Sequence, residues 1–145
     1  SAVWQNVSAL VNKVSRDTNP GEVRVDNDIP PGVEVFADPM IDKVFFNLVD
    51  NAVRHGGKVA TIRFSVEEGS GVLTIICQDD GAGITADRKG CLFVHDPDGD
   101  HGFGLFLSRE ILAITGISIR ENSGEGQGAR FEMTVPAGRW RDISN

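Results

Sequence analysis

The feature that most constrains the fold of this chain is a pair of apolar segments joined by a turn that is too short to hold a helix. Residues 61–67 and 72–79 are rich in β-branched side chains, and Glu68-Gly69-Ser70-Gly71 separates them. Such a glycine-containing connection predicts two antiparallel strands in a hairpin. Parallel pairing would need a crossover of about a dozen residues or more, so the chain is not a regular βαβ series.

Three other segments repeat apolar residues at helical spacing and predict helices. They cover residues 3–16, a stretch from Asp38 to about His55, and residues 103–115. We expect Asp38 to cap the second helix, with Pro39 as its first residue, and Gly56-Gly57 to end it.

Short segments at 23–25, 33–36, 117–120 and 129–135 predict further strands. Residues 85–101 lack a period and predict a loop, and the tail over 137–145 is expected to fray. Helices that alternate with mostly hairpin-joined strands predict an α/β (α+β) two-layer sandwich. Its helices are expected to cover one face of a mixed, mostly antiparallel sheet.

The composition limits the partners and the setting of the protein. The 145 residues fit a single domain over 1–145, and the formal net charge of −7 disfavours DNA or RNA as a partner. Cys77 and Cys91 form no CxxC pair, so a reducing compartment is expected. No apolar stretch approaches the roughly 20 residues of a membrane span, and no signal peptide opens the chain. We expect a cytoplasmic domain without direct membrane contact. Because no Met opens the chain, we also expect a fragment of a longer protein.

Polar residues repeat along one side of the second predicted helix. Asn47, Asn51 and His55 are spaced by four, offset from the apolar stripe. Carboxamides in line can offer oxygens to a hard cation and N–H groups to a phosphate, and Mg²⁺ needs few protein ligands. The alternative interpretation is a solvated helix face or a capping network.

Two glycine-containing motifs follow in the chain. Asp79 ends an apolar strand and is followed by Asp80-Gly81-Ala82-Gly83-Ile84. Its carboxylate could accept a hydrogen bond from an exocyclic amine such as that of adenine. Gly102-Phe103-Gly104-Leu105 opens a helix, where bare N–H groups and the helix dipole favour a phosphate. Taken singly, the first motif is also typical of a tight turn, and Gly126-Gln127-Gly128 of a hairpin turn.

Other candidate ligands give weaker patterns. Asp96, Asp98 and Asp100 alternate as in a calcium loop, but His101 stands at the required glycine. His95 and His101 have no third ligand at a convincing spacing, and no Ser/His/Asp or Cys/His pair has a context for nucleophilic catalysis.

In this order, the motifs resemble those of the ATP-binding catalytic domain of sensor histidine kinases, in the GHKL superfamily that also includes DNA gyrase. The resemblance covers the chain from about Trp4 to Pro136 and implies the Bergerat-type ATP-binding fold. The matching segments are the N box at 47–55, the first glycine box at 79–84, the F box at 92–93, the second glycine box at 102–105 and the third at 126–131.

The resemblance implies a role for each matching residue. Asn47, Asn51 and Arg54 would be catalytic, with Asn51 as the magnesium ligand. Asp79 would bind the adenine amine, and residues 85–101 would form a mobile lid over the triphosphate. The residues implied to bind the nucleotide are Asn47, Asn51, Arg54, His55, Asp79, Gly81, Gly83, Ile84, Gly102, Phe103, Gly104 and Leu105.

The implied function is that of a protein histidine kinase, which binds ATP with Mg²⁺ and transfers the γ-phosphoryl group to a histidine in two-component signal transduction. Gyrase-like ATPases have a glutamate where this chain has Asn47, and an amide is not a general base, so hydrolysis is expected to be poor. None of His55, His95 and His101 lies on a long amphipathic helix with an adjacent acid. The acceptor is therefore expected on a separate dimerisation domain, absent from this chain.

The implied partners are ATP, that phosphoacceptor domain and a downstream response regulator. The isolated domain is expected to be a monomer and its parent a homodimer, which can be attached to a membrane. Two departures keep other functions open: the expected lid has cations only at Arg88 and Lys89, and Asp98 and Asp100 would repel a triphosphate. Weak ATP affinity is expected, and the alternatives are an anti-sigma-like serine kinase or a nucleotide-sensing or interaction module without catalysis.

Overall fold

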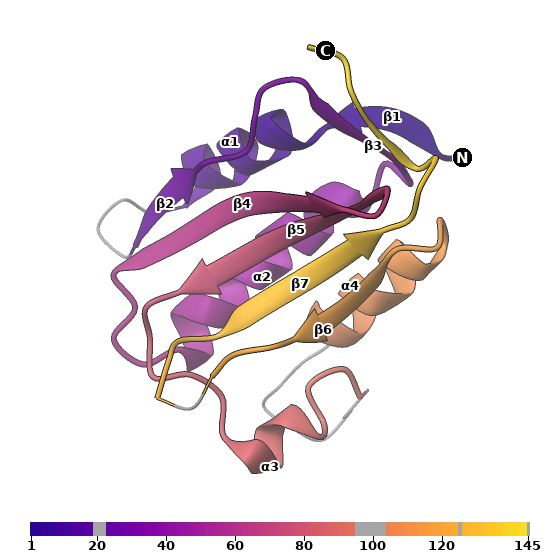
Figure 1. Cartoon of the computed structure of the whole chain (residues 1–145). Coiled ribbons are helices and arrows are strands. Elements are labelled where there is room, and N and C mark those ends of the chain that lie inside the picture. Colours follow the sequence, from indigo (N-terminus) through magenta and orange to yellow (C-terminus); the bar gives the residue numbers. More distant parts are fainter. Residues whose placement is uncertain (19–22, 95–103, 125, 145) are drawn as a thin grey trace.

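The structure is a computed structural model that describes residues 1–18, 23–94, 104–124 and 126–144 (Figure 1). Its main layer is a five-stranded sheet with the strand order β2-β4-β5-β7-β6. β2 pairs with β4 in parallel, and the other pairs in this sheet are antiparallel. The strands are β2 (Arg24–Asn27), β4 (Thr61–Gly69), β5 (Val72–Asp79), β6 (Ser118–Glu121) and β7 (Arg130–Val135).

The predicted hairpin forms the centre of this sheet. β4 pairs with the whole of β5 from Ile62 to Gly69, and Ser70-Gly71 turns the chain with positive φ angles of 55° and 79°. A two-residue turn with both φ angles positive matches the twist of paired strands. β4 is two residues longer than predicted, because Glu68 and Gly69 still pair with β5.

Three helices cover one face of the five-stranded sheet, as the sequence predicts (Figure 1). They are α1 (Val7–Asp17), α2 (Ile41–His55) and α4 (Gly104–Ala113). Their apolar stripes and the inward side chains of the strands form one core. Phe45 of α2 and Phe64 of β4 are fully buried there, with ring centroids 5.7 Å apart.

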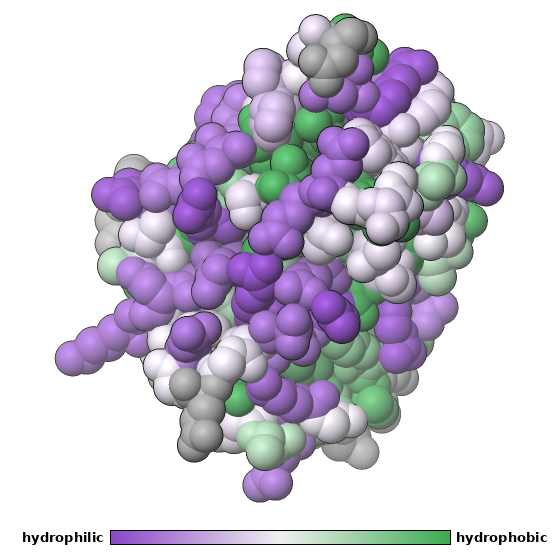
Figure 2. All heavy atoms as spheres, viewed as in Figure 1, coloured by the Kyte–Doolittle hydropathy of each residue, from purple (hydrophilic) through white to green (hydrophobic). Residues whose placement is uncertain are grey.

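The opposite face of the sheet is polar. Hydrophilic side chains cover much of the surface turned to the viewer in Figure 2. Glu132 of β7 lies buried in this layer, where Arg120 and Arg130 each approach it to 2.8 Å. Burial by itself raises the pKa of Glu132, but hydrogen bonds from Arg130, Arg120 and Asn122 hold it below its usual value.

A second, three-stranded sheet is absent from the prediction. It has the order β1-β3-β8 and is antiparallel throughout. Residues 3–6, predicted as helix, pair with β3 instead, and Asn6 caps α1 by accepting from the Ala9 N–H at 2.8 Å. The tail predicted to fray also pairs with β3. The three strands are β1 (Val3–Asn6), β3 (Val33–Ala37) and β8 (Trp140–Asp142).

The predicted start of α2 is wrong by two residues, whereas its predicted end is confirmed. The Asp38 carboxylate accepts from the Met40 N–H at 2.8 Å and its carbonyl from the Ile41 N–H at 2.9 Å. Asp38 thus closes a turn ahead of the helix, and the helix begins at Ile41. Gly56 follows the last helical residue, His55, as its C-cap.

The segment predicted as a loop over 85–101 contains a short helix, α3 (Ala86–Lys89). Thr85 caps it, because its hydroxyl accepts from the Arg88 N–H. Residues 95–101 of this segment lie outside the described part of the chain. Within that described part, no helix has the length and apolar character needed to cross a membrane.

Candidate functional site

A cavity lies where the end of α2 meets the end of β5. Segments that are far apart in the sequence line it, and five of the predicted site residues meet there: Asn51, His55, Asp79, Gly83 and Ile84. The remaining lining residues are Ala52, Gly56, Arg88 and Ala129. The cavity therefore brings together the asparagine helix, the first glycine box and Ala129 of the third glycine box.

Asp79 is the buried acid of this cavity. Its side-chain Oδ1 accepts from the backbone N–H groups of Gly81 at 2.9 Å and Ala129 at 3.1 Å. Among the described residues, no donor is bonded to Oδ2, which leaves that oxygen as an acceptor for a ligand amine. Burial raises the pKa of Asp79, and the hydrogen bonds from Gly81 and Ala129 offset only part of the increase.

Glycines let the surrounding backbone segments approach closely. A Cβ on Gly128 would lie 2.0 Å from the Asp79 carbonyl oxygen, and one on Gly81 would lie 2.3 Å from the Gly56 carbonyl oxygen. Gly83 has a φ of +81°, and its Cβ would lie 2.2 Å from the Gln127 carbonyl oxygen. Side chains at these positions would push apart the backbone that positions Asp79.

The two asparagines of α2 differ in their surroundings. Asn47 donates from Nδ2 to the Gly104 carbonyl at 3.1 Å and to the Ser108 hydroxyl at 3.2 Å. The Ser108 hydroxyl in turn donates to the Gly104 carbonyl at 2.7 Å. Asn51 lines the cavity, and its carboxamide has no hydrogen-bond partner in the described part of the chain. Asn47 thus fixes the start of α4, whereas the oxygen of Asn51 is available to a ligand.

The described residues could hold Mg²⁺ only together with a ligand that supplies further oxygens. No group of three His, Cys, Asp or Glu side chains among the described residues could hold a metal ion. A single amide oxygen from Asn51 together with phosphate oxygens and water is a sufficient set for Mg²⁺. The protein residues therefore fit a metal that arrives with a polyphosphate ligand.

Other predicted site residues lie outside the cavity. Arg54 is exposed and pairs with Asp50 at 3.1 Å, one turn back on α2. Gly104 is the first residue of α4, and Leu105 is buried in the core. Gly102 and Phe103 lie outside the described residues, as do the histidines and acidic residues over 95–101.

Two residues outside the predicted set make hydrogen bonds that shape the site. Ser108 is fully buried and joins α2 to α4, and Ala129 supplies a hydrogen bond to Asp79. The available signal for Ser108 was its spacing: it follows Gly104 by four, the spacing at which a serine can bond the carbonyl one turn back. Ala129 has no comparable local signal, because its partner is 50 residues away.

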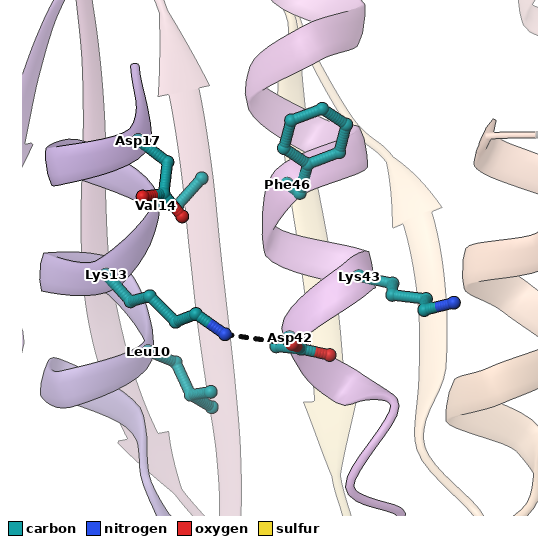
Figure 3. A pocket seen from close by; sticks show the side chains of 7 residues that line it. All are labelled: Leu10, Lys13, Val14, Asp17, Asp42, Lys43 and Phe46. Atoms are coloured by element: carbon teal, nitrogen blue, oxygen red, sulfur yellow. Dashed lines mark hydrogen bonds and ion pairs between the residues drawn. The ribbon is translucent and has the colours of Figure 1, made fainter.

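A separate hollow of about 210 Å³ lies between α1 and α2 (Figure 3). Leu10, Val14 and Phe46 supply its apolar surface, and Lys13 reaches across to Asp42 at 3.2 Å. None of the predicted site residues lines it. This hollow is therefore separate from the predicted site residues that meet at the cavity around Asp79.

This arrangement of an acid, an asparagine helix and glycine segments can be compared with known proteins. The family described as "Histidine kinase-, DNA gyrase B-, and HSP90-like ATPase" matches residues 37–139, which include all of the cavity. The chain belongs to this family.

Curated relatives of this ATPase-family chain are sensor kinases. The alginate biosynthesis sensor protein KinB of Pseudomonas aeruginosa is 35% identical over 101 residues, which cover 66% of this chain. The sensor histidine kinase ZraS of Escherichia coli O157:H7 is 33% identical over 143 residues, which cover 90%. The chain spans only 17% and 31% of the lengths of these two relatives.

Solved structures confirm the fold of this ATPase-family domain. The catalytic domain of histidine kinase ThkA superposes with a TM-score of 0.77 at 22% identity, covering 94% of this chain and 95% of that one. The mycobacterial sensor histidine kinase MprB gives a TM-score of 0.80 at 14% identity, covering 99% and 100%. The predicted two-layer sandwich with helices on one face is the fold of these domains.

Proposed function

We propose that this chain is the catalytic domain of a sensor histidine kinase, which binds Mg-ATP and donates the γ-phosphoryl group to a histidine on a separate dimerisation domain. The observation that carries the proposal is Asp79, a buried carboxylate with one oxygen left for a ligand amine, beside the free carboxamide of Asn51. The sensor kinases among the relatives support the same function.

The chain's own residues would act by binding and orientation. Asp79 would accept from the adenine amine, and Gly81 and Gly83 would let the backbone pass close to the base. Asn51 would hold Mg²⁺ against the phosphates, where the metal neutralises charge. Asn47, already bonded to Gly104, would fix the start of α4 near the triphosphate.

The transfer step needs a nucleophile from outside this chain. The acceptor imidazole nitrogen would attack the γ-phosphorus, the bond from that phosphorus to the β–γ bridging oxygen would break, and ADP would leave. His55 lines the cavity itself, so it is poorly placed to be the acceptor. We further propose a monomeric isolated domain, a homodimeric parent, a response regulator as the next recipient, and the cytoplasm as the place of action.

Calorimetric titration with a non-hydrolysable ATP analogue and Mg²⁺ tests the binding step. We expect the parent to bind and Asn51→Ala and Asp79→Asn each to lose about tenfold or more in affinity, because charge-assisted or cation contacts are removed. Asp17→Asn, in the hollow between α1 and α2, is the matched control and should bind like the parent. No binding by the parent at millimolar ligand would favour an interaction module instead.

Transfer from γ-labelled ATP tests the catalytic step. The domain is mixed with a histidine dimerisation domain of a sensor kinase, and the label is examined for acid lability. Acid-labile label on the added domain, lost in Asn51→Ala, supports histidine phosphorylation. Acid-stable label on a serine would indicate the anti-sigma-like kinase, and binding without transfer would indicate a nucleotide sensor.

A further inference from the structure

The helix α3 lies beside the cavity without being packed into the core. It follows directly from the segment of Gly81 to Ile84, and its Arg88 lines the same cavity as Ile84. Yet none of the four residues of α3 is buried. The apolar contacts begin after α3, where Leu92 is buried and Phe93 makes an edge contact with Phe131.

A second hollow separates α3 from the connection between β6 and β7. It has a volume of about 490 Å³, and Figure 1 shows α3 below that end of the sheet. One wall comes from the segment at 82–89 and the other from Gly124, Gly126 and Gln127. Gly83 and Gln127 bring the two walls close together at one edge of this hollow. The hollow itself leaves α3 without apolar packing against the other wall.

Lys89 connects α3 to the end of β6. Its Nζ lies 3.2 Å from Glu121 Oε1 at the end of β6 and donates to the Ser123 carbonyl at 3.0 Å. Among the described residues, it is the α3 side chain that bonds to another element. The side-chain contact between α3 and the sheet is therefore the ion pair of Lys89 with Glu121.

The Glu121 carboxylate is buried and fixed in position by backbone hydrogen bonds. Only 2% of its side chain is exposed, and its carboxylate also accepts from the backbone N–H groups of Ser123 at 3.3 Å and Arg130 at 3.0 Å. Burial alone raises its pKa, but those N–H groups and Lys89 hold the pKa below its usual value, so the carboxylate is ionised at neutral pH.

The Glu121 end of the bridge is fixed to the same strand segment as Asp79. The Ala129 N–H donates to Asp79 and the next N–H, of Arg130, donates to Glu121. Two adjacent residues of the chain are thus bonded to the cavity acid and to the bridge. A displacement of α3 relative to Glu121 changes the position of Ile84 and Arg88 relative to Asp79.

We propose that Lys89 and Glu121 form an ionic bridge that positions α3, and with it the wall formed by Ile84 and Arg88, for nucleotide binding. The inference rests on the proposed function, in which that cavity receives the adenine. Lys89 is a positioning residue here and makes no contact with the phosphates. Losing the bridge lowers the fraction of molecules in the binding-competent arrangement, and the apparent affinity falls by that fraction.

The binding test uses Lys89→Met, Glu121→Gln, their double variant and Lys89→Arg, each with Mg²⁺ and with ATP, ADP or adenosine competing against a fluorescent ADP analogue. Because the ion pair is partly exposed, we expect nucleotide affinity to fall by about three- to fivefold in each single variant. The loss should be equal for the three ligands, because the wall contacts the base. The double variant should bind no worse than either single variant, and Lys89→Arg should restore binding.

Several results would overturn the bridge. A loss confined to ATP would show that Lys89 contacts the phosphates directly, and additive losses would show that Lys89 and Glu121 act independently. Tighter binding in Lys89→Met would show that the bridge opposes the ligand. Lys43→Met on α2 is the matched lysine control and should bind like the parent.

A measurement without nucleotide keeps this proposal separate from the proposed function. Millisecond amide hydrogen exchange should accelerate over 86–89 in both Lys89→Met and Glu121→Gln, but not in Lys43→Met. Unchanged exchange would overturn the bridge even if the parent binds ATP. Accelerated exchange in the two variants, together with a parent that binds no nucleotide, would support the bridge and contradict the proposed function.

Discussion

Burial makes the charge of Asp79 sensitive to mild acid. Its ordinary pKa of 3.8 is raised in the folded protein, so the carboxylate begins to protonate at a higher pH than an exposed aspartate does. A protonated Asp79 is a poorer acceptor for the adenine amine. We expect nucleotide affinity to fall as the pH decreases through this raised pKa, measured by titration between about pH 7.5 and 4.5.

The effect of Asp79 on folding has the opposite sign. Because its folded pKa lies above its unfolded value, the folded state binds more protons in the window between the two, and this residue favours folding as the pH falls. A loss of affinity caused by Asp79 should therefore occur while circular dichroism still reports a folded domain. Affinity that stays constant down to the lowest pH at which circular dichroism still reports a folded domain would contradict the assignment.

Gly128 gives a second prediction for a single residue. A Cβ there would lie 2.0 Å from the backbone carbonyl of Asp79, which cannot move without displacing β5. We expect Gly128→Ala to reduce the free energy of unfolding by about 1–3 kcal/mol, measured by urea denaturation. Gly69→Ala, where no atom lies within 4 Å of the added Cβ, is the control and should change it by less than about 0.5 kcal/mol. Equal effects of the two substitutions would refute the close approach.

Individual elements differ in how far local sequence could predict them. The apolar stripe of α2 predicted its face and its end at Gly56 correctly, since both depend on residues within the helix. Residues 3–6 and 140–142 are strands because β3 pairs with them on both sides. Segments of three or four residues carry no period that could show this. In the same way, Asp79 could be predicted as a candidate site residue from its place after an apolar strand, whereas its hydrogen bond from Ala129 could not.

The contact between α2 and α4 is a hydrogen-bonded network as well as an apolar one. Asn47, Ser108 and the Gly104 carbonyl bond to each other, so removing one group leaves a buried partner unsatisfied. We expect Asn47→Ala to reduce the free energy of unfolding by about 1–2 kcal/mol in urea. Asn12→Ala, whose side chain accepts a hydrogen bond from Asn27 on the surface, is the control.

The same network makes a prediction about coupling. Asn47→Ala and Ser108→Ala should destabilise less together than the sum of their separate effects, since each disrupts the same set of bonds. Additive effects would show that Asn47 and Ser108 act separately. Nucleotide affinity should fall in Asn47→Ala, because the start of α4 is no longer fixed.

At the scale of the whole molecule, the two sheets are joined far from the candidate site. Trp140 of β8 donates from Nε1 to the Gly71 carbonyl at 2.9 Å, at the opposite end of β5 from Asp79. Arg141 bonds to Glu34 of β3 and stacks over Trp4 of β1 at 4.0 Å, so β8 also holds the three-stranded sheet together. The contacts of β8 therefore contribute to stability at the end of the molecule away from the candidate site.

This separation predicts that Trp140→Ala weakens folding without weakening binding. We expect a loss of about 2 kcal/mol in the free energy of unfolding, because a half-buried indole and its hydrogen bond are removed. The Kd for the ATP analogue should stay within about twofold, because seven residues of β5 separate Gly71 from Asp79. Ligand at 100 times Kd should then stabilise parent and variant equally, by about 2.7 kcal/mol. A smaller gain in Trp140→Ala than in the parent would show that the small sheet also shapes the cavity.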